Sequence, residues 1–295
     1  MTEIHHRFLN QALVEIADAR GLRYEEWGQG WVTRVGDGER YLSTYGYQLS
    51  INPVVAASVA RDKSAAVERL ERDGVAVVST HLVLNAVRQD WLDGRRPDQV
   101  LDDALAALLA SGPTTLIVKP NEGSSGDGVY LCRDEAEARR RVQDLLAREP
   151  SVVIQPFLEL DREERWIVLD GQARLRYTKR PADPGQSGRR APLFNLALGA
   201  TVGDFGLGGA HPDAERLAVA AARSLGLRVA AVDLVSGTDV ARAVLEVNSG
   251  LSFEHLVRLE PSRRADAVGV YDSVVAAALA DHPTPSARSA STLRG

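Results

Sequence analysis

The spacing of apolar and polar residues predicts a chain that changes repeatedly between helices and strands. Between Phe8 and Arg20, apolar side chains recur on one helical face, and Gly21 follows as a helix stop. Segments 31–35 and 40–44 lie on either side of a Gly-Asp-Gly-Glu turn, which is typical of a β-hairpin. The first part of the chain is therefore predicted to combine a helix with a hairpin.

The rest of the chain continues the alternation. Asp62 is the expected N-cap of a helix that runs to Gly74, and long strands are expected on either side of the turn Asp170-Gly171. Those two strands are 164–170 and 173–179. The other predicted strands are 75–78, 114–119, 129–132, 152–157, 228–235 and 241–248. The other predicted helices are 98–110, 134–148, 213–225 and 262–280. A tail at 282–295, rich in Pro, Ser and Ala, is expected to be mobile.

Composition favours a folded, cytoplasmic protein. The 295 residues are 44% hydrophobic and 25% charged, and the single cysteine, Cys132, cannot form an internal disulfide. A net charge of −5 offers no basic field for nucleic acid. No apolar run approaches the roughly 18 residues of a membrane span, and the start lacks the pattern of a signal peptide. We therefore expect neither a nucleic acid nor a membrane as partner.

Lysine is rare in this chain. Of 35 basic residues only Lys63, Lys119 and Lys179 are lysines, and the other 32 are arginines. Arginine is a planar fork, whereas lysine is a compact point charge on a flexible stem. A position that keeps lysine in this background is a candidate for a site that needs the small ammonium, with chance survival as the alternative.

Two acidic residues face each other in the last predicted hairpin. If its turn is centred between positions 239 and 240, Asp233 lies opposite Glu246, with Cβ atoms about 5 Å apart. Asn248 lies two residues from Glu246 and shares its face. Two carboxylates and an amide oxygen suit Mg²⁺, which prefers hard oxygen ligands. Outward-facing acids remain the alternative, because the register is assumed.

A glycine-rich loop follows Lys119. Residues 122–128, Glu-Gly-Ser-Ser-Gly-Asp-Gly, join two predicted strands, unlike the phosphate loops that open a helix. Glycines let backbone N–H groups approach a polyphosphate, and serine hydroxyls add donors. The loop can therefore cover phosphates as a flap, and an ordinary hairpin loop is the alternative.

The order of these motifs resembles the ATP-grasp ligase superfamily over about residues 45 to 280. The motifs are RDKSAAVERLERDGVAV, LIVKPNEGSSGDGV, VVIQPFLE, EERWIVLDG, FNLALGA, LGLRVAAVDLV and VLEVNSGLSFE. They look most like carboxylate–amine ligases related to glutathione synthetase, cyanophycin synthetase and the ribosomal-protein glutamate ligases. The resemblance implies an α/β (α+β) ATP-grasp fold. Its expected parts are a small N-terminal lobe at 1–60, a lid-bearing lobe at 61–155 and a metal-binding lobe at 156–281.

The resemblance also implies site residues. Lys63 and Lys119 would hold the nucleotide phosphates, Glu163 the ribose, and Asn195 would lie near the phosphates. Arg165 and Arg180 would be the catalytic cations that meet the transferred phosphate and the acyl-phosphate. The lid would include Gly123, Ser124, Ser125, Gly126 and Gly128, and the adenine hinge Gln155, Pro156, Phe157 and Leu158. Magnesium would bind Asp233, Glu246 and Asn248.

The implied reaction is ATP-dependent formation of an amide bond between two amino acids or short peptides through an acyl-phosphate. Glutamate is a candidate carboxylate donor, and the expected cofactors are ATP and two Mg²⁺ ions, with Mn²⁺ as an alternative ion. A non-catalytic nucleotide-binding module, or a ligase for another carboxylate, remains open, as does a homodimer. Tyr45, Tyr47 and Asn52 are candidate substrate contacts, and the loop at 181–192 is a candidate carboxylate clamp.

Overall fold

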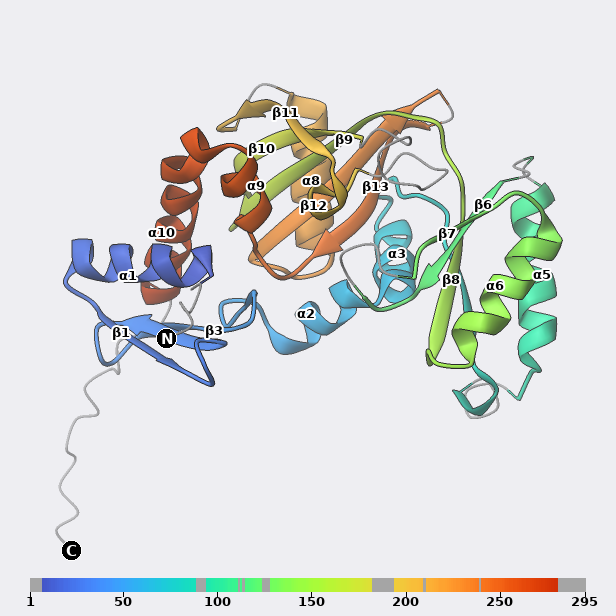
Figure 1. Cartoon of the computed structure of the whole chain (residues 1–295), viewed down its shortest axis with the longest axis horizontal. Helices are drawn as coiled ribbons and strands as arrows, with labels where there is room; N and C mark the ends of the chain where they lie inside the picture. The colour runs from blue at the N-terminus through green and yellow to red at the C-terminus, as the bar shows by residue number, and fades with distance from the viewer. Residues whose placement is uncertain are drawn as a thin grey trace, which may run out of the picture.

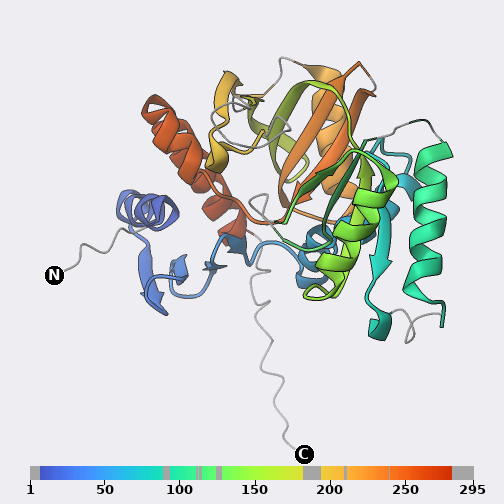
Figure 2. The same ribbon diagram turned by 45° about the vertical axis from the view of Figure 1, so that its right-hand side comes forward.

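The fold is built from three antiparallel sheets joined by helices. The computed structural model describes residues 7–88, 94–110, 112, 115–123, 128–181, 194–208, 211–238 and 240–280. The predicted mobile tail, most of the 181–192 loop and the lid residues Ser124, Ser125 and Gly126 lie outside this part. Figures 1 and 2 show the N-terminal sheet at one end of the molecule and the β5–β8 sheet at the other, with the largest sheet between them.

The strand order of each sheet is as follows. The N-terminal sheet is β1 (Arg23–Trp27), β2 (Val32–Gly36), β3 (Tyr41–Tyr45) and β4 (Gln48–Leu49). The four-stranded sheet at the other end is β5 (His81–Leu84), β8 (Ser151–Pro156), β6 (Leu116–Pro120) and β7 (Tyr130–Cys132). The central sheet is β11 (Thr201–Gly206), β10 (Gln172–Arg180), β9 (Leu160–Leu169), β12 (Val229–Gly237) and β13 (Val240–Asn248). All strand pairs within these sheets are antiparallel, which confirms the predicted α+β character.

Helices pack against the faces of all three sheets. The α-helices are α1 (Phe8–Arg20), α2 (Val54–Arg61), α3 (Lys63–Arg72), α5 (Pro97–Ala110), α6 (Glu135–Leu146), α8 (Pro212–Ser224), α9 (Glu254–Leu259) and α10 (Arg264–Ala280), and two short 3₁₀ helices are η1 (Leu196–Leu198) and η2 (Pro261–Arg263). Helices α1 and α10 pack on the N-terminal sheet and share one core with the central sheet. Helix α8 covers the opposite face of the central sheet, and α5 and α6 cover the β5–β8 sheet. No helix of the described residues is long and apolar enough to cross a bilayer.

Local signals predicted several boundaries correctly. Helix α1 ends at Gly21, which adopts the left-handed conformation with φ of 65°. The Asp62 carboxylate accepts a hydrogen bond from Ala65 N–H at 2.9 Å and caps α3. Asp170 and Gly171 have φ of 49° and 73°, as a tight turn between β9 and β10 requires.

Two predictions about strands were wrong. Segment 75–78 forms no full strand but lies beside β13, the edge strand of the central sheet, where Val77 makes one isolated parallel bridge to Val244. Val78 N–H donates to Val244 O and Val244 N–H donates to Ala76 O, and the pairing extends no further, although Val75 and Val78 are buried. The turn of the last hairpin is centred one residue earlier than expected, because Gly237 pairs with Val240.

Candidate active site

One face of the central sheet changes from apolar to charged along three adjacent strands. On β9, β10 and β12 this face begins with side chains of the core shared with α10. It then continues into Arg165, Lys179 and Asp233, with Glu163 one step further along β9. Register explains the grouping, since Lys179 lies directly opposite Glu163 and Arg165 directly opposite Asp233.

These four side chains form a continuous network of charge-assisted hydrogen bonds. Lys179 Nζ donates to Glu163 Oε1 at 2.5 Å and to Asp233 Oδ1 at 2.9 Å. Arg165 donates to the same carboxylate of Asp233 through Nε at 2.8 Å and Nη2 at 2.6 Å. Paired in this way, four charged groups can remain ionised in a mostly buried position.

The pKa of each buried acid depends on the balance between burial, which raises it, and neighbouring positive charges, which lower it. Burial favours the neutral form of Asp233, but the charges of Arg165 and Lys179 outweigh it and lower the pKa of Asp233. For Glu163 burial is the stronger effect, and the Asp233 charge adds to it, so the pKa of Glu163 is raised despite the contact with Lys179. The state of Glu163 therefore depends on how close the lysine stays.

Glu246 extends this row to the edge of the sheet. It pairs with Asp233 across the β12–β13 ladder, which confirms the predicted facing pair. Two irregularities each add a residue on β13 between the turn and Glu246, and together they compensate for the displaced turn. Glu246 and Asn248 are partly exposed, in contrast to the buried Asp233.

The other two lysines approach this row from the β5–β8 sheet and from α3. Lys119 of β6 is buried, and burial lowers the pKa of its ammonium to about 8, with charges of Glu246, Lys63 and Glu163 also acting on it. Lys63 donates to the backbone oxygens of Asn121 at 3.3 Å and Gly123 at 3.0 Å. All three lysines of the chain therefore lie near one another, because Lys63 and Glu163 both act on Lys119 and Glu163 also binds Lys179.

The described ends of the glycine loop are compatible with a tight return between strands. Gly123 and Gly128 have φ of 140° and 69°, conformations that favour glycine. A Cβ on Gly128 would also lie 3.0 Å from Pro120 Cγ. Lys63 holds the first of these glycines in place through its carbonyl.

The predicted adenine hinge lies where β8 ends. Gln155 is buried and donates to Thr80 Oγ1 at 2.7 Å, and Pro156 is the last residue of the strand. Phe157 N–H donates to Thr115 O at 3.0 Å, and Leu158 packs against a small apolar cluster next to β12 and β13. The hinge is thus rigid, and the roles of its four residues in base binding remain a prediction.

Two predicted residues are not brought into the charged network. Arg180 follows Lys179 on β10 and therefore points to the opposite face, beside Gly203 of β11, where it is exposed. Asn195 Oδ1 accepts from Ala197 N–H at 2.8 Å and caps η1. Their roles at the phosphates also remain predictions.

Comparison with known proteins identifies the family. The profile of the RimK-like ATP-grasp domain matches residues 100–260, more than half of the chain. The chain belongs to the RimK-like ATP-grasp family. It is similar to a probable alpha-L-glutamate ligase of Azotobacter vinelandii, with 27% identity over 75% of this chain and 64% of the relative. A probable alpha-L-glutamate ligase of Xanthomonas campestris pv. campestris is 30% identical over 71% of this chain and 62% of its own.

Solved ATP-grasp structures share the fold. The D-cycloserine synthetase DcsG aligns with a TM-score of 0.55 and 23% identity over 76% of this chain and 73% of its own. A D-alanine–D-alanine ligase from Bacillus anthracis aligns with a TM-score of 0.53 and 17% identity over 77% of this chain and 68% of its own. The chain spans 60 to 64% of the length of the first curated relatives.

The ATP-grasp site of this chain offers oxygen donors that fit magnesium. Among the described residues, no group of three or more His, Cys, Asp and Glu side chains gathers as a metal site. The available donors are the Glu246 carboxylate, the Asn248 amide oxygen and part of Asp233. Asp233 Oδ1 already accepts two hydrogen bonds, but Oδ2 accepts only one and keeps a lone pair. With oxygens from a phosphate and water, this set suits a hard cation.

The charged network includes one residue that the motif resemblance does not select, and one candidate substrate contact lies outside it. Lys179 is central to the network, and its only signal in the sequence is the rarity of lysine. Asn52 makes two hydrogen bonds through its amide nitrogen and two through its oxygen, all to backbone groups. Asn52 is therefore structural and has little capacity left for a substrate.

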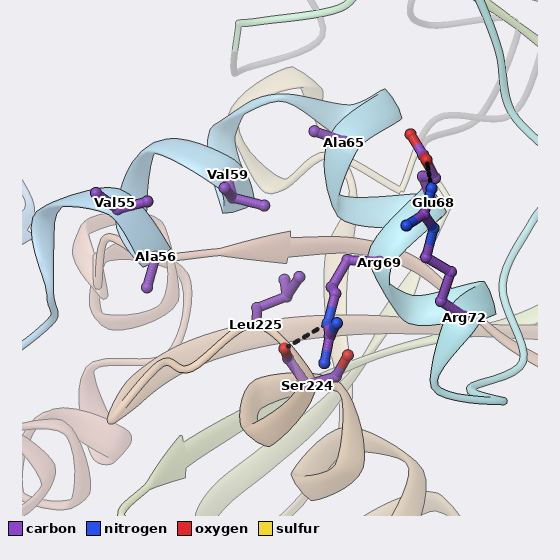
Figure 3. A pocket seen from close by; sticks show the side chains of 9 residues that line it. All are labelled: Val55, Ala56, Val59, Ala65, Glu68, Arg69, Arg72, Ser224 and Leu225. Atoms are coloured by element: carbon purple, nitrogen blue, oxygen red, sulfur yellow. Dashed lines mark hydrogen bonds and ion pairs between the residues drawn. The ribbon is translucent and has the colours of Figure 1, made fainter.

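An open groove of about 470 Å³ lies away from this site. It is formed by α2, α3 and the end of α8, and its lining is mostly apolar (Figure 3). Arg69 crosses it and donates to Ser224 O at 3.4 Å. None of the predicted ATP-grasp residues lines this groove.

Substitution of Lys119 is expected to weaken nucleotide binding even when the charge is kept. Lys119→Ala and Lys119→Arg should each raise the ADP dissociation constant at least ~10-fold, because a charge-assisted hydrogen bond contributes about 1.5–3 kcal/mol and a guanidinium fork does not fit a buried point-charge position. Isothermal titration calorimetry measures this constant. In the wild type, ADP affinity should also fall as pH rises through 8, because the ammonium is then lost.

The exposed Arg72 provides the matched control, since it pairs with Glu68 on the surface of α3. Arg72→Ala should leave ADP affinity within about twofold of wild type. Unchanged affinity in both Lys119 variants would show that Lys119 is structural.

Proposed function

We propose that this protein is an ATP-dependent carboxylate–amine ligase that joins amino acids or short peptides and releases ADP and phosphate. The observation that carries the proposal is the opposition of two lysines, Lys63 and Lys119, to the charged row on the central sheet. Membership of the RimK-like ATP-grasp family supports the reaction class. The alpha-L-glutamate ligase relatives support glutamate as one of the two substrates.

Each group of side chains has its own role in the proposed reaction. Lys63 and Lys119 bind the phosphates, and Glu163 accepts hydrogen bonds from the ribose hydroxyls. Arg165, aimed by its two bonds to Asp233, neutralises charge that develops on the transferred phosphoryl group. The substrate carboxylate attacks the γ-phosphorus, ADP leaves, and an amine then displaces phosphate from the acyl-phosphate to form the amide. No side chain has to act as a nucleophile.

Magnesium would be held by Glu246, Asn248 and the free lone pair of Asp233. When bound, the metal neutralises the phosphate oxygens and orients them for in-line transfer. We propose two ions, with Mn²⁺ able to replace Mg²⁺, and a cytoplasmic location where ATP is available.

The nucleotide product tests the mechanism. Incubation with ATP, magnesium and pairs of amino acids that include glutamate should give ADP, phosphate and amide in equal amounts, because cleavage falls between the β and γ phosphorus atoms. With an ¹⁸O-labelled carboxylate, mass spectrometry should find one ¹⁸O atom in the released phosphate. Formation of AMP and pyrophosphate, or of unlabelled phosphate, would exclude the acyl-phosphate route.

Omission of the amine is the internal control. Without it, amide formation should stop, and ADP release should fall to the slow hydrolysis of the acyl-phosphate. ADP binding without turnover for any amino acid or peptide pair would instead favour a nucleotide-binding module.

A further inference from the structure

Lys179 occupies an unusual position between two acids that the proposed function uses separately. Its ammonium, 5% exposed, lies 2.5 Å from Glu163 Oε1 and 2.9 Å from Asp233 Oδ1. One acid belongs to the ribose end of the proposed nucleotide site and the other to the phosphate end. A single atom, Nζ, therefore connects the two ends of the site.

The network requires a cation at this position. Glu163 and Asp233 are both buried, and two carboxylates near each other in a poorly solvated place repel one another. Arg165 donates through two of its nitrogens to Asp233 and makes no hydrogen bond to Glu163. Among the residues that the structure describes, only the Lys179 ammonium donates hydrogen bonds to both acids.

The shape of the lysine side chain explains why position 179 is a lysine rather than an arginine. The ammonium is directly opposite Glu163 on β9 and diagonal to Asp233 on β12, so it must donate in two directions from one small centre. A guanidinium is planar and directs its donors along a fork. In a chain with 32 arginines and three lysines, the retained lysine fits this geometric requirement.

We propose that Lys179 is a positioning residue of the nucleotide site, which ties the Glu163 and Asp233 carboxylates together and keeps Glu163 available as an acceptor for the ribose. This inference rests on the proposed function. Of the two neighbours on β10, Lys179 faces the row of charged groups, whereas Arg180 lies on the opposite face beside Gly203.

The test compares Lys179→Met with Arg72→Met, which removes the same charge from the exposed surface of α3. Calorimetry with ADP and EDTA measures nucleotide affinity without metal, turnover or amino-acid substrate. Lys179→Met is expected to raise the ADP dissociation constant at least ~10-fold, a typical coupling within one hydrogen-bond network. Arg72→Met should change it by less than about twofold. In steady-state assays Lys179→Met should raise KM for ATP more than it lowers kcat.

A double variant separates positioning from simple stability. If Lys179 acts through Glu163, Lys179→Met combined with Glu163→Gln should bind ADP about as weakly as Glu163→Gln alone, because the second change removes a contact already lost. Additive losses would overturn the proposal. So would a Lys179→Met protein that melts at a lower temperature but binds ADP with wild-type affinity, or an Arg72→Met protein that loses as much affinity.

Two further measurements keep these outcomes interpretable. If Lys179→Met does not fold, Lys179→Gln, which retains amide donors but no charge, replaces it, with the same expected loss of affinity. Failure of the wild type to bind ADP would contradict the proposed function itself. Wild-type binding with unaffected Lys179 variants would contradict only the role of Lys179.

Discussion

Glu246→Ala is expected to lower turnover by at least ~100-fold while leaving the protein folded. Glu246 is partly exposed, and it extends the charged row at the sheet edge beside Asn248, where the proposed metal ligands lie. Loss of this carboxylate should reduce neutralisation of the phosphate oxygens without opening a core cavity. Initial rates of ADP release, measured together with a thermal melt, check both parts of the expectation.

A surface carboxylate provides the control for this variant. Glu25 is exposed on β1 at the other end of the molecule, so Glu25→Ala should retain wild-type turnover. Mn²⁺ titration followed by electron paramagnetic resonance should show weakened metal binding in the Glu246→Ala protein, in the presence of ADP. A folded Glu246→Ala protein with wild-type rates would refute the assignment.

Asp233→Asn is expected to cost stability as well as activity. The amide keeps the shape of the carboxylate but leaves the buried Lys179 and the partly exposed Arg165 with an uncharged partner. Breaking one side of a buried ion pair typically costs about 3–5 kcal/mol. For a chain of this size that lowers the melting temperature by on the order of 10 °C. Differential scanning calorimetry measures the shift.

The stability effect of Asp233→Asn is expected to depend on pH. The folded pKa of Asp233 lies below its ordinary value of 3.8, so its stabilising effect is present above that value and is lost as pH falls toward the folded pKa. The stability difference between wild type and Asp233→Asn should therefore be largest near neutral pH and shrink below about pH 4. Urea unfolding at several pH values measures it.

The ion pair of Asp213 with Arg216 on α8 provides a matched surface comparison. Both side chains are more than 70% exposed, so Asp213→Asn should change stability by less than about 1 kcal/mol. An equally small effect of Asp233→Asn would show that the buried network contributes little to stability.

Local sequence patterns determined many of the elements and part of the site. Gly21 ends a helix, Asp62 begins one and Asp170-Gly171 turns a hairpin because each effect depends only on neighbouring backbone groups. The rarity of lysine also marked three positions that lie near the same charged groups. The ordered motifs led to the ATP-grasp family for the same reason, since motif order is a property of the chain itself.

Tertiary structure decided which charged groups meet. Segment 75–78 is strand-like in composition, yet it pairs with the edge strand β13 at one parallel bridge only, and nothing in its own residues signals how far that pairing extends. The irregularities of β13 bring Glu246 opposite Asp233 although the turn is displaced, and no local signal encodes such compensation. Lys179 meets Asp233 only because β9 lies between their strands in one particular register. Sequence identified the ionisable side chains, but the register and faces of the central sheet determined their partners.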